Sequence, residues 1–484
     1  MRLLVRNALL MPVSDAGPDW FHGWMLVGDD GRISAMGKGE PGAGLMAQQT
    51  DGELRTLDVG GAIVAPGFVS AHSHLFTSGM RGISSGSTLY PWVLSMVEVL
   101  DKSGPEDLYW STLHGSLDFL ANGVTSAYNF THSRVTWRYD PATASPRLGR
   151  VQPVEFVTRQ FDAVADSGLR VVNAVRLDDE AGAEAEVLDV FATMVHESAR
   201  RTPADQYLGT SVMGAVQWAS SRRSAELEVQ VMEEHGLTNQ AHFVETAEGL
   251  ETQREKFAWY ADAGALSPRF LFGHFVHPTD SMIETAVEAG CGMVWQATSN
   301  GRLGSGVADV VRLRRAGMRV GLGLDDQSCT DISDPWGNMR IGLYGARAMY
   351  TDASVLMPRD VLRMHTLGAA EVMGVDDRIG SLEVGKLADF LVVDHRAPDT
   401  GPVWDVDATY VLACGLRNLR QVYVGGRLVS EDGRSTSPLA AAAPVELRAR
   451  MTEAAHRLGT HLPLAELEAA ASGTSAPIQP GFRR

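Results

Sequence analysis

The chain has 484 residues, of which 44% are hydrophobic and 21% are charged, a balance that is typical of folded globular proteins and excludes extensive disorder. Its formal net charge of -17 repels phosphate backbones and anionic lipids, so we expect neither nucleic acid nor a membrane as a partner. The three cysteines form no CxxC pair, which excludes a thiolate zinc site and a disulfide framework and favours a cytoplasmic location. The N-terminus shows no signal-type cleavage site and no apolar run reaches about 18 residues, so neither export nor a membrane span is expected.

Both ends of the chain predict β structure. Residues 1–65 contain short apolar runs that end at Gly, Asp or Pro, which is the pattern of strands and turns. Similar segments return in residues 376–435, for example ADFLVVD and LRQVYVGGRLVSEDG. Because neither stretch is long enough to bury a core alone, we predict that the two combine into one small discontinuous β-sandwich domain.

Residues 66–375 alternate apolar runs with segments of helical periodicity, such as FVSAHSH followed by DLYWSTLHGSLDFLANG. About eight such units predict an α/β fold, a (β/α)8 TIM barrel whose functional residues lie at the carboxyl ends of its strands. The remaining residues, 436–484, predict a C-terminal helix, VELRARMTEAAHRLG, followed by a frayed tail.

The motif AHSHL places His72 and His74 at the end of an apolar run. Residues i and i+2 of a strand point to the same face, so both imidazoles can bind one metal ion, although two polar residues that merely close a strand would look the same. Further residues of ligand type follow later predicted strands, namely His242, Glu245, His274 and Asp325. Ligands from several strand ends around one barrel mouth form a constellation that chance rarely produces.

In chain order, PGFVSAHSHLFTSGMRG, LYPWVLSM, NGVTSAYN, AHFVETAE, GHFVH, SNGRLGSG, GLGLDD and IGSLEVGKLADFLVVD resemble the motifs of the amidohydrolase superfamily. The resemblance is to its branch of chlorohydrolases and aminoheterocycle deaminases, and it extends from near the start to about residue 435. It implies an enzyme that acts on a small molecule: metal-activated hydroxide attacks a ring carbon of an aminated N-heterocycle and ammonia leaves. It also implies a homodimer.

Carried over to this sequence, the resemblance implies a metal-ligand set of His72, His74, His242 and Asp325. These ligands suit one divalent ion, zinc first and iron as the alternative, and the chain has no match to the lysine that bridges two metals in other members. Such an ion lowers the pKa of a water molecule from about 16 toward 7, so that hydroxide forms at neutral pH.

The resemblance to the amidohydrolase superfamily also implies three catalytic residues. Asp325 takes a proton from the attacking water, Glu245 gives one to the ring nitrogen, and His274 orients the water or stabilises charge. Two alternatives stay open, because Glu245 could be a surface carboxylate and His277 could take the place of His274.

Four further residues are candidates for substrate binding. Arg81 could grip an anionic or carbonyl group, Trp92 and Trp295 could stack on a planar ring, and Gln296 lies beside Trp295. The tryptophans could equally be core or loop aromatics, and the arginine a solvated loop residue. Departures from the family pattern, which are Gln240 for a histidine, Asp326 for a glycine and Trp295-Gln296-Ala297 for His-Asn-Pro, predict an altered pocket wall and an unusual substrate.

Two other functions compete with ring deamination. The same machinery could hydrolyse another ring substituent or a cyclic amide, because it does not select the leaving group. A catalytically inactive, ligand-binding member is a different class of protein, and the complete ligand set together with Glu245 argues against it. The zinc deaminases that act on flipped bases are excluded because the chain has no PCxxC motif.

Overall fold

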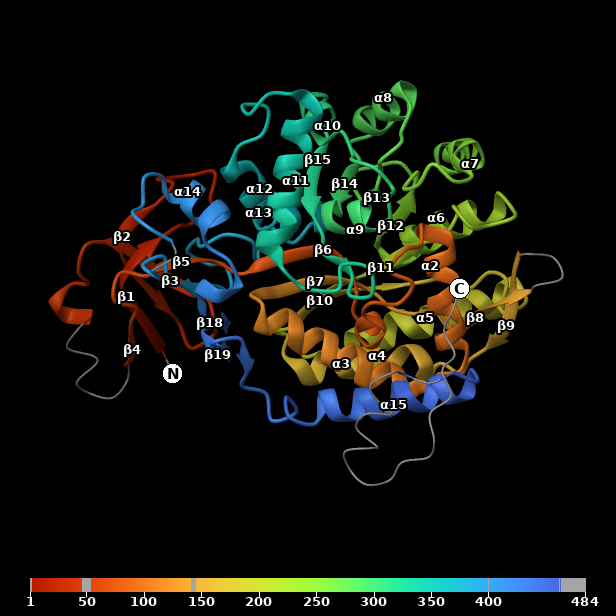
Figure 1. Ribbon diagram of the computed structural model, residues 1–484, viewed down its shortest axis with the longest axis horizontal. Helices are drawn as coiled ribbons and strands as arrows, with labels where there is room; N and C mark the ends of the chain where they lie inside the picture. The colour runs from red at the N-terminus through yellow and green to blue at the C-terminus, as the bar shows by residue number, and fades with distance from the viewer. Residues whose placement is uncertain (1, 46–53, 141–144, 399, 461, 463–484) are drawn as a thin grey trace.

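The structure, a computed structural model, describes residues 2–45, 54–140, 145–398, 400–460 and 462. A parallel barrel surrounded by helices forms the larger part, and a mixed sheet lies at one side of it (Figure 1). Strands from both ends of the chain build this second sheet. The predicted α/β barrel with a β domain from the two chain ends is therefore confirmed.

The barrel strands pair in parallel with their neighbours throughout. In chain order they are β6 (Phe68–His74), β7 (Val124–Phe130), β10 (Arg170–Val175), β11 (Tyr207–Gly214), β12 (Thr238–Phe243), β13 (Phe270–His274), β14 (Gly292–Trp295), β15 (Arg319–Leu322) and β16 (Asp325–Asp326). The short β16 follows β15 closely and pairs with β6, so the end of the sheet returns to its beginning. This closure brings Asp325 beside the strand that carries His72 and His74.

Helices cover the outside of the barrel (Figure 1). They are η1 (Leu75–Met80), α2 (Leu89–Asp101), α3 (Pro105–Ala121), α4 (Glu155–Ser167), α5 (Glu184–Arg201), α6 (Arg223–His235), α7 (Leu250–Asp262), α8 (Asp280–Glu288), α9 (Ala297–Arg302), α10 (Val310–Arg315), α11 (Pro335–Tyr350), α12 (Pro358–Met364) and α13 (Leu367–Met373). With helices outside and side chains filling the interior, β6, β7, β10 and β13 are buried along their whole length.

Two additions depart from the simple alternation. A hairpin of β8 (Val135–Asp140) and β9 (Ser145–Val151) is inserted between β7 and α4. The C-terminal helix α15 (Ala443–Arg457) runs along α3 (Figure 1), which agrees with the helix predicted there. The tail predicted to follow it falls largely on residues 461 and 463–484, outside the described residues.

The β domain is one branched mixed sheet. Its strands are β1 (Arg2–Leu10), β2 (Phe21–Val27), β3 (Ile33–Lys38), β4 (Leu54–Asp58), β5 (Ile63–Pro66), β17 (Phe390–Val393), β18 (Leu419–Val424), β19 (Arg427–Glu431) and β20 (Arg434–Ser435), and the short α14 (Val406–Ala408), η2 (Thr409–Ala413) and η3 (Leu416–Asn418) lie between β17 and β18. The central strand β5 pairs with β1 on one side and with β17 on the other, which joins the two chain ends. A buried two-pronged ion pair of Arg170 with Asp389, at 2.6 and 2.8 Å, ties this domain to the start of β10.

Within the part of the chain that the structure describes, no helix combines the length and the apolar character needed to cross a membrane.

Candidate active site

Four strand ends bring the predicted ligands together at one end of the barrel. His72 and His74 lie on β6, His242 lies on β12, His274 ends β13 and Asp325 begins β16, and all five are buried. Groups of these side chains have their ligand atoms within 4.8 Å of one another, notably His72 with His242 and His274, and His72 with His74 and Asp325. We call these five residues the histidine cluster.

The spacing of the donor atoms fits a single small cation. Nε2 of His74 lies 3.2 Å from Nε2 of His72 and 3.1 Å from Nε2 of His242. Oδ1 of Asp325 lies 3.4 Å from Nε2 of His72 and 3.7 Å from Nε2 of His74. Two ligands bound tetrahedrally to zinc at about 2.1 Å stand about 3.4 Å apart, so these separations match what one bound ion requires.

Burial also sets the charge states that a cation needs. Desolvation, together with the neighbouring imidazoles, lowers the pKa of His74 and His242 well below the ordinary value, so both rings are neutral and carry a free lone pair at neutral pH. Desolvation lowers the pKa of His274 to about 3. Burial acts to raise the pKa of Asp325, but the neighbouring His274 and His72 outweigh it and hold the pKa well below its usual range. The cluster therefore offers neutral nitrogens and one anionic carboxylate.

Gln240 fixes the orientation of one imidazole. Its Nε2 donates to the carbonyl of Ala71 at 3.0 Å, which turns Oε1 toward Nδ1 of His72 at 2.5 Å. An amide oxygen only accepts, so the proton of His72 resides on Nδ1 and its Nε2 lone pair faces the cluster. The glutamine that the sequence marks as a departure from the family pattern thus lies directly behind a ligand-type histidine.

Helix α9 supplies two supporting residues that sequence reasoning missed as site residues. Oγ of Ser299 donates to Oδ2 of Asp325 at 2.5 Å. Nδ2 of Asn300 donates to Nδ1 of His274 at 2.9 Å, which leaves the ring proton on Nε2, the nitrogen that faces Asp325 at 3.7 Å. The signal for both was present, because SNGRLGSG is a polar stretch directly after a barrel strand.

Glu245 lies two residues after β12 and is 1% exposed, so the surface alternative for this carboxylate is wrong. Its Oε2 lies 3.5 Å from Nε2 of His274, and its Oε1 has no hydrogen-bond partner among the described residues. Burial, and then the charge of Asp325, raises the pKa of Glu245 well above the ordinary value. A raised pKa favours the protonated form of the carboxyl group, which suits Glu245 to donate a proton.

Backbone strain gathers at the same strand ends. His274, Asp325 and Val244 all adopt positive φ, at 66°, 67° and 45°. Such conformations cost on the order of 1–3 kcal/mol each, persist only when the surrounding structure holds them, and cluster at functional sites. Positive φ is especially unfavourable for a β-branched residue such as Val244. The turn at Val244 is what carries the chain from His242 to Glu245 so that both side chains reach one site.

Two more residues border the cluster. The ring of Phe130, at the end of β7, stacks on His74 with centroids 4.8 Å apart and lies 4.5 Å from His72. Asp326, whose Oδ2 lies 3.7 Å from Nε2 of His74, is buried beside Asp325. Burial and the charge of Asp325 raise the pKa of Asp326 well above the ordinary value, so only one of these adjacent carboxyls is anionic.

The candidate substrate residues lie in different surroundings. Trp92 is 3% exposed in an apolar cluster with Phe76 and Leu303, and Trp295 is 1% exposed and packs against Gly342 of α11. Both are core aromatics, the second of the two interpretations that the sequence allowed. The guanidinium of Arg81 forms a 2.6 Å ion pair with Asp118 of α3, outside the cluster.

Gln296, by contrast, lies beside the cluster. Its Oε1 accepts a hydrogen bond from the backbone N–H of His274 at 2.9 Å. His277 is turned to the carbonyl of Ser305 at 2.7 Å and is not part of the cluster, so His274 is the histidine that the structure brings to the site.

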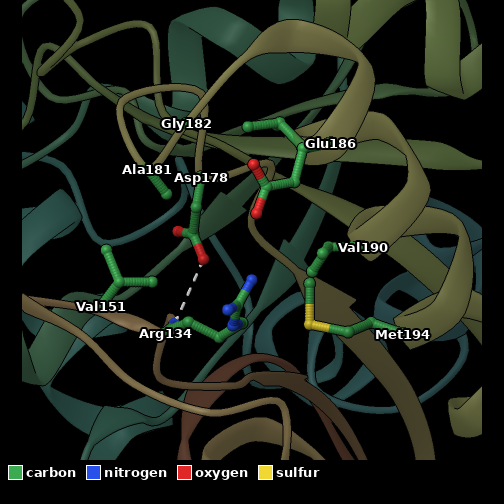
Figure 2. Close-up of a pocket in the computed structure, with 9 residues that line it drawn as sticks. Arg134, Val151, Asp178, Ala181, Gly182, Glu186, Val190 and Met194 are labelled. Carbon is green, nitrogen blue, oxygen red and sulfur yellow. Dashed lines mark hydrogen bonds between the residues drawn. The ribbon is translucent and has the colours of Figure 1, made fainter.

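Figure 2 shows a small pocket of about 30 Å³ that contains no member of the cluster. It is lined by Arg134, Val151, Asp178, Ala181, Gly182, Glu186, Val187, Val190 and Met194. Asp178 accepts a hydrogen bond there from the backbone N–H of Arg134 at 3.2 Å.

Known proteins resemble this chain over most of its length. A 5-methylthioadenosine/S-adenosylhomocysteine deaminase from Symbiobacterium thermophilum is 28% identical over 94% of this chain and 99% of that protein. Among solved structures, a zinc-bound adenosine deaminase from Xanthomonas campestris shares the fold with a TM-score of 0.77 at 22% identity, over 93% of this chain and 98% of that one.

An atrazine chlorohydrolase from Arthrobacter aurescens, solved with zinc, has a TM-score of 0.79 at 20% identity, over 93% of this chain and 100% of that one. The profile of the amidohydrolase family matches residues 63–429, which span the barrel and most of the C-terminal strands of the β domain. The resemblance expected from the sequence motifs is confirmed, and the chain belongs to the amidohydrolase family.

Proposed function

We propose that this protein is a metal-dependent hydrolase that deaminates an aminated N-heterocycle. The observation that carries the proposal is the convergence of three imidazole nitrogens, with Nε2 of His74 within 3.2 Å of Nε2 of both His72 and His242. They lie beside an anionic Asp325 and a buried Glu245 whose pKa is raised. Addition of water to a ring carbon requires a metal ion that activates the water and a nearby acid that protonates the ring. The cluster and Glu245 can supply these two parts. The deaminase name of a relative that aligns with 94% of the chain supports the same reaction.

The donor set fits one divalent ion, zinc, held by His72, His74, His242 and Asp325. Imidazole nitrogens whose lone pairs face one another at 3.1 to 3.2 Å repel unless a cation lies between them, and nitrogen with one carboxylate oxygen suits zinc, with iron as the alternative. A divalent ion in this position supplies Lewis acidity and lowers the pKa of water from about 16 to about 7.

The protein's own groups move the protons. Glu245, held neutral by burial, donates its proton to the ring nitrogen as the water oxygen adds to the neighbouring carbon. Asp325 accepts the proton of the attacking water, and His274 stabilises the charge that develops, with its orientation fixed by Asn300. Asp325 passes the proton that it took from water to the amino group, which leaves as ammonia when the C–N bond breaks. The added hydroxyl becomes a ring carbonyl and returns its proton to Glu245, so a ring amine and water give a ring carbonyl and ammonia.

Elemental analysis tests the metal directly. We expect about one zinc per chain after expression with zinc, because the cluster has one anionic carboxylate and a single set of converging nitrogens. Two ions per chain, or none after supplementation, would contradict this expectation.

Gln240→Leu is expected to weaken zinc affinity by about 10- to 100-fold, because Nδ1 of His72 loses the acceptor that fixes its tautomer. Competition with a chromophoric chelator measures the affinity. Gln240→Glu retains the acceptor for Nδ1 of His72 but loses the donor to the carbonyl of Ala71, so it should lose less affinity than Gln240→Leu. Equal loss in both variants would show that the acceptor for Nδ1 is not what supports zinc affinity.

The substrate class that we propose is an aminated purine, with its nucleosides as the first probes. The test is ammonia release from a panel of 5′-methylthioadenosine, adenosine, guanine and an aminotriazine, with chloride release from a chlorotriazine measured in parallel. Ammonia release from a purine supports the proposal. Chloride release alone would favour hydrolysis of another ring substituent, and no turnover by a zinc-loaded protein would favour a ligand-binding member.

We also propose a homodimer, on the family resemblance, and light scattering in solution would measure it. A cytoplasmic location is supported by the three cysteines, which are all buried and form no disulfide among the described residues.

A further inference from the structure

Trp218 lies beside the histidine cluster without being part of any apolar core. It belongs to the loop of residues 215–222, which follows β11 at the end of the barrel where the cluster lies. Its ring centroid is 5.5 Å from that of His242, with the planes inclined at 54°. The side chain is 45% exposed, so one part of the indole contacts the cluster and another part is open.

The loop is held in this position by contacts from two helices. Nζ of Lys256 on α7 donates to the carbonyls of Gln217 and Ala219 at 2.7 Å each, on either side of Trp218. Glu228 on α6 accepts from the backbone N–H of Ala215 at 2.7 Å, where the loop begins. A half-exposed indole fixed by such contacts is pre-organised and loses little conformational entropy when a ligand binds.

The neighbouring residue points to a polar partner. Gln217 is 5% exposed, yet neither atom of its amide has a hydrogen-bond partner among the described residues. A buried amide without partners is costly, so such a group marks a position where a ligand supplies the missing bonds. A heterocycle offers the matching features, with flat faces for an indole and ring nitrogens at its edge for an amide.

We propose that Trp218 is the wall on which the substrate's aromatic ring stacks and that Gln217 hydrogen-bonds the polar edge of that ring. This inference rests on the proposed function, because it assigns the ring-binding side of the same site. Trp92 and Trp295 cannot serve in this way, since both are buried in apolar clusters. The specificity of the enzyme for planar aromatic rings therefore resides in the loop after β11.

The experiment compares Trp218→Ala and Trp218→Phe with Trp20→Phe, a control at a tryptophan that is equally exposed but belongs to the β domain side of the chain. The probe is inosine, a 6-oxopurine with no amino group to lose, and its binding is followed by quenching of tryptophan fluorescence. We expect quenching in the parent protein and in Trp20→Phe, and its loss in Trp218→Phe.

Affinity and kinetics separate stacking from a structural role. For Trp218→Ala we expect the Kd of inosine, measured by calorimetry, and the KM for adenosine to rise about 10- to 100-fold, with kcat changed by less than about threefold and zinc content unchanged. Trp218→Phe, which retains a ring, should stay within about fivefold of the parent. Gln217→Leu should raise the Kd about tenfold while the quenching amplitude persists.

Different results would contradict the proposed deamination and the proposed role of Trp218 and Gln217 in binding the ring. If no aminated ring of the panel is deaminated but inosine quenches Trp218, the proposed function fails and the stacking wall stands. Unchanged Kd in Trp218→Ala, loss of zinc from that variant, or quenching that persists in Trp218→Phe would overturn the stacking wall. An unchanged Kd in Gln217→Leu would overturn the hydrogen bond to the ring edge.

Discussion

Replacing Glu245 with glutamine is expected to lower kcat by roughly 10²- to 10⁴-fold, the usual worth of a positioned general acid. The amide cannot give up a proton to the ring, although it has almost the same shape as the carboxyl group. Zinc content should be unchanged, because Glu245 is not among the groups of converging ligand atoms. Steady-state kinetics together with elemental analysis of the same preparation checks both statements.

Glu248→Gln is the matched control for this variant. Glu248 lies three residues further along the same loop, is exposed, and accepts a hydrogen bond from Thr88 at 2.7 Å. The same substitution at this position should leave kcat within about twofold of the parent. A Glu245→Gln enzyme with nearly the parent rate would mean that another group protonates the substrate, and would favour a reaction whose leaving group needs no ring protonation.

Replacing Asp325 with asparagine should lower kcat at least as much as Glu245→Gln does, by roughly 10³-fold or more. It should also reduce the zinc content below one ion per chain. The substitution removes the anionic donor that lies 3.4 Å from Nε2 of His72 and the acceptor of the Ser299 hydrogen bond. Asparagine tolerates positive φ as well as aspartate does, so the backbone at φ 67° is not disturbed. A loss of activity and zinc in this variant would therefore result from removing the carboxylate and not from a disturbed backbone.

Asp432→Asn is the control variant for Asp325→Asn. Asp432 also has a positive φ, of 46°, but lies at the turn between β19 and β20 in the β domain. This variant should retain full zinc content and activity. If Asp325→Asn also retained both, Asp325 would be neither a ligand nor a proton acceptor, and the donor set would need a different fourth member.

The sequence could indicate the candidate ligands because their pattern is local. The two-residue spacing of His72 and His74 places both side chains on one face of a strand, and His242 and Asp325 lie near the ends of segments that become the barrel strands β12 and β15. Parallel strands of a barrel end at the same mouth, so position at a strand end already implies proximity. For the same reason Glu245, three residues after His242, could be assigned to the site.

The supporting contacts could not be predicted in this way. Ser299 and Asn300 reach Asp325 and His274 from a helix that begins after a different strand. Gln240 was visible as an unusual residue, but its contact with His72 joins residues 168 positions apart. Spacing along the chain does not determine such pairings, because they depend on the register between strands.

By itself, the sequence determined the fold class, the family and the set of ligand-type residues, because strand periodicity and strand-end motifs are properties of short segments. Only the tertiary structure decided which aromatic ring faces the cluster. Trp295 ends a barrel strand as a ring-binding residue would, yet it packs beneath α11, whereas Trp218, in a loop without a motif, lies beside His242. The direction of a side chain at a strand end depends on the helices packed outside the barrel, and these come from distant parts of the chain.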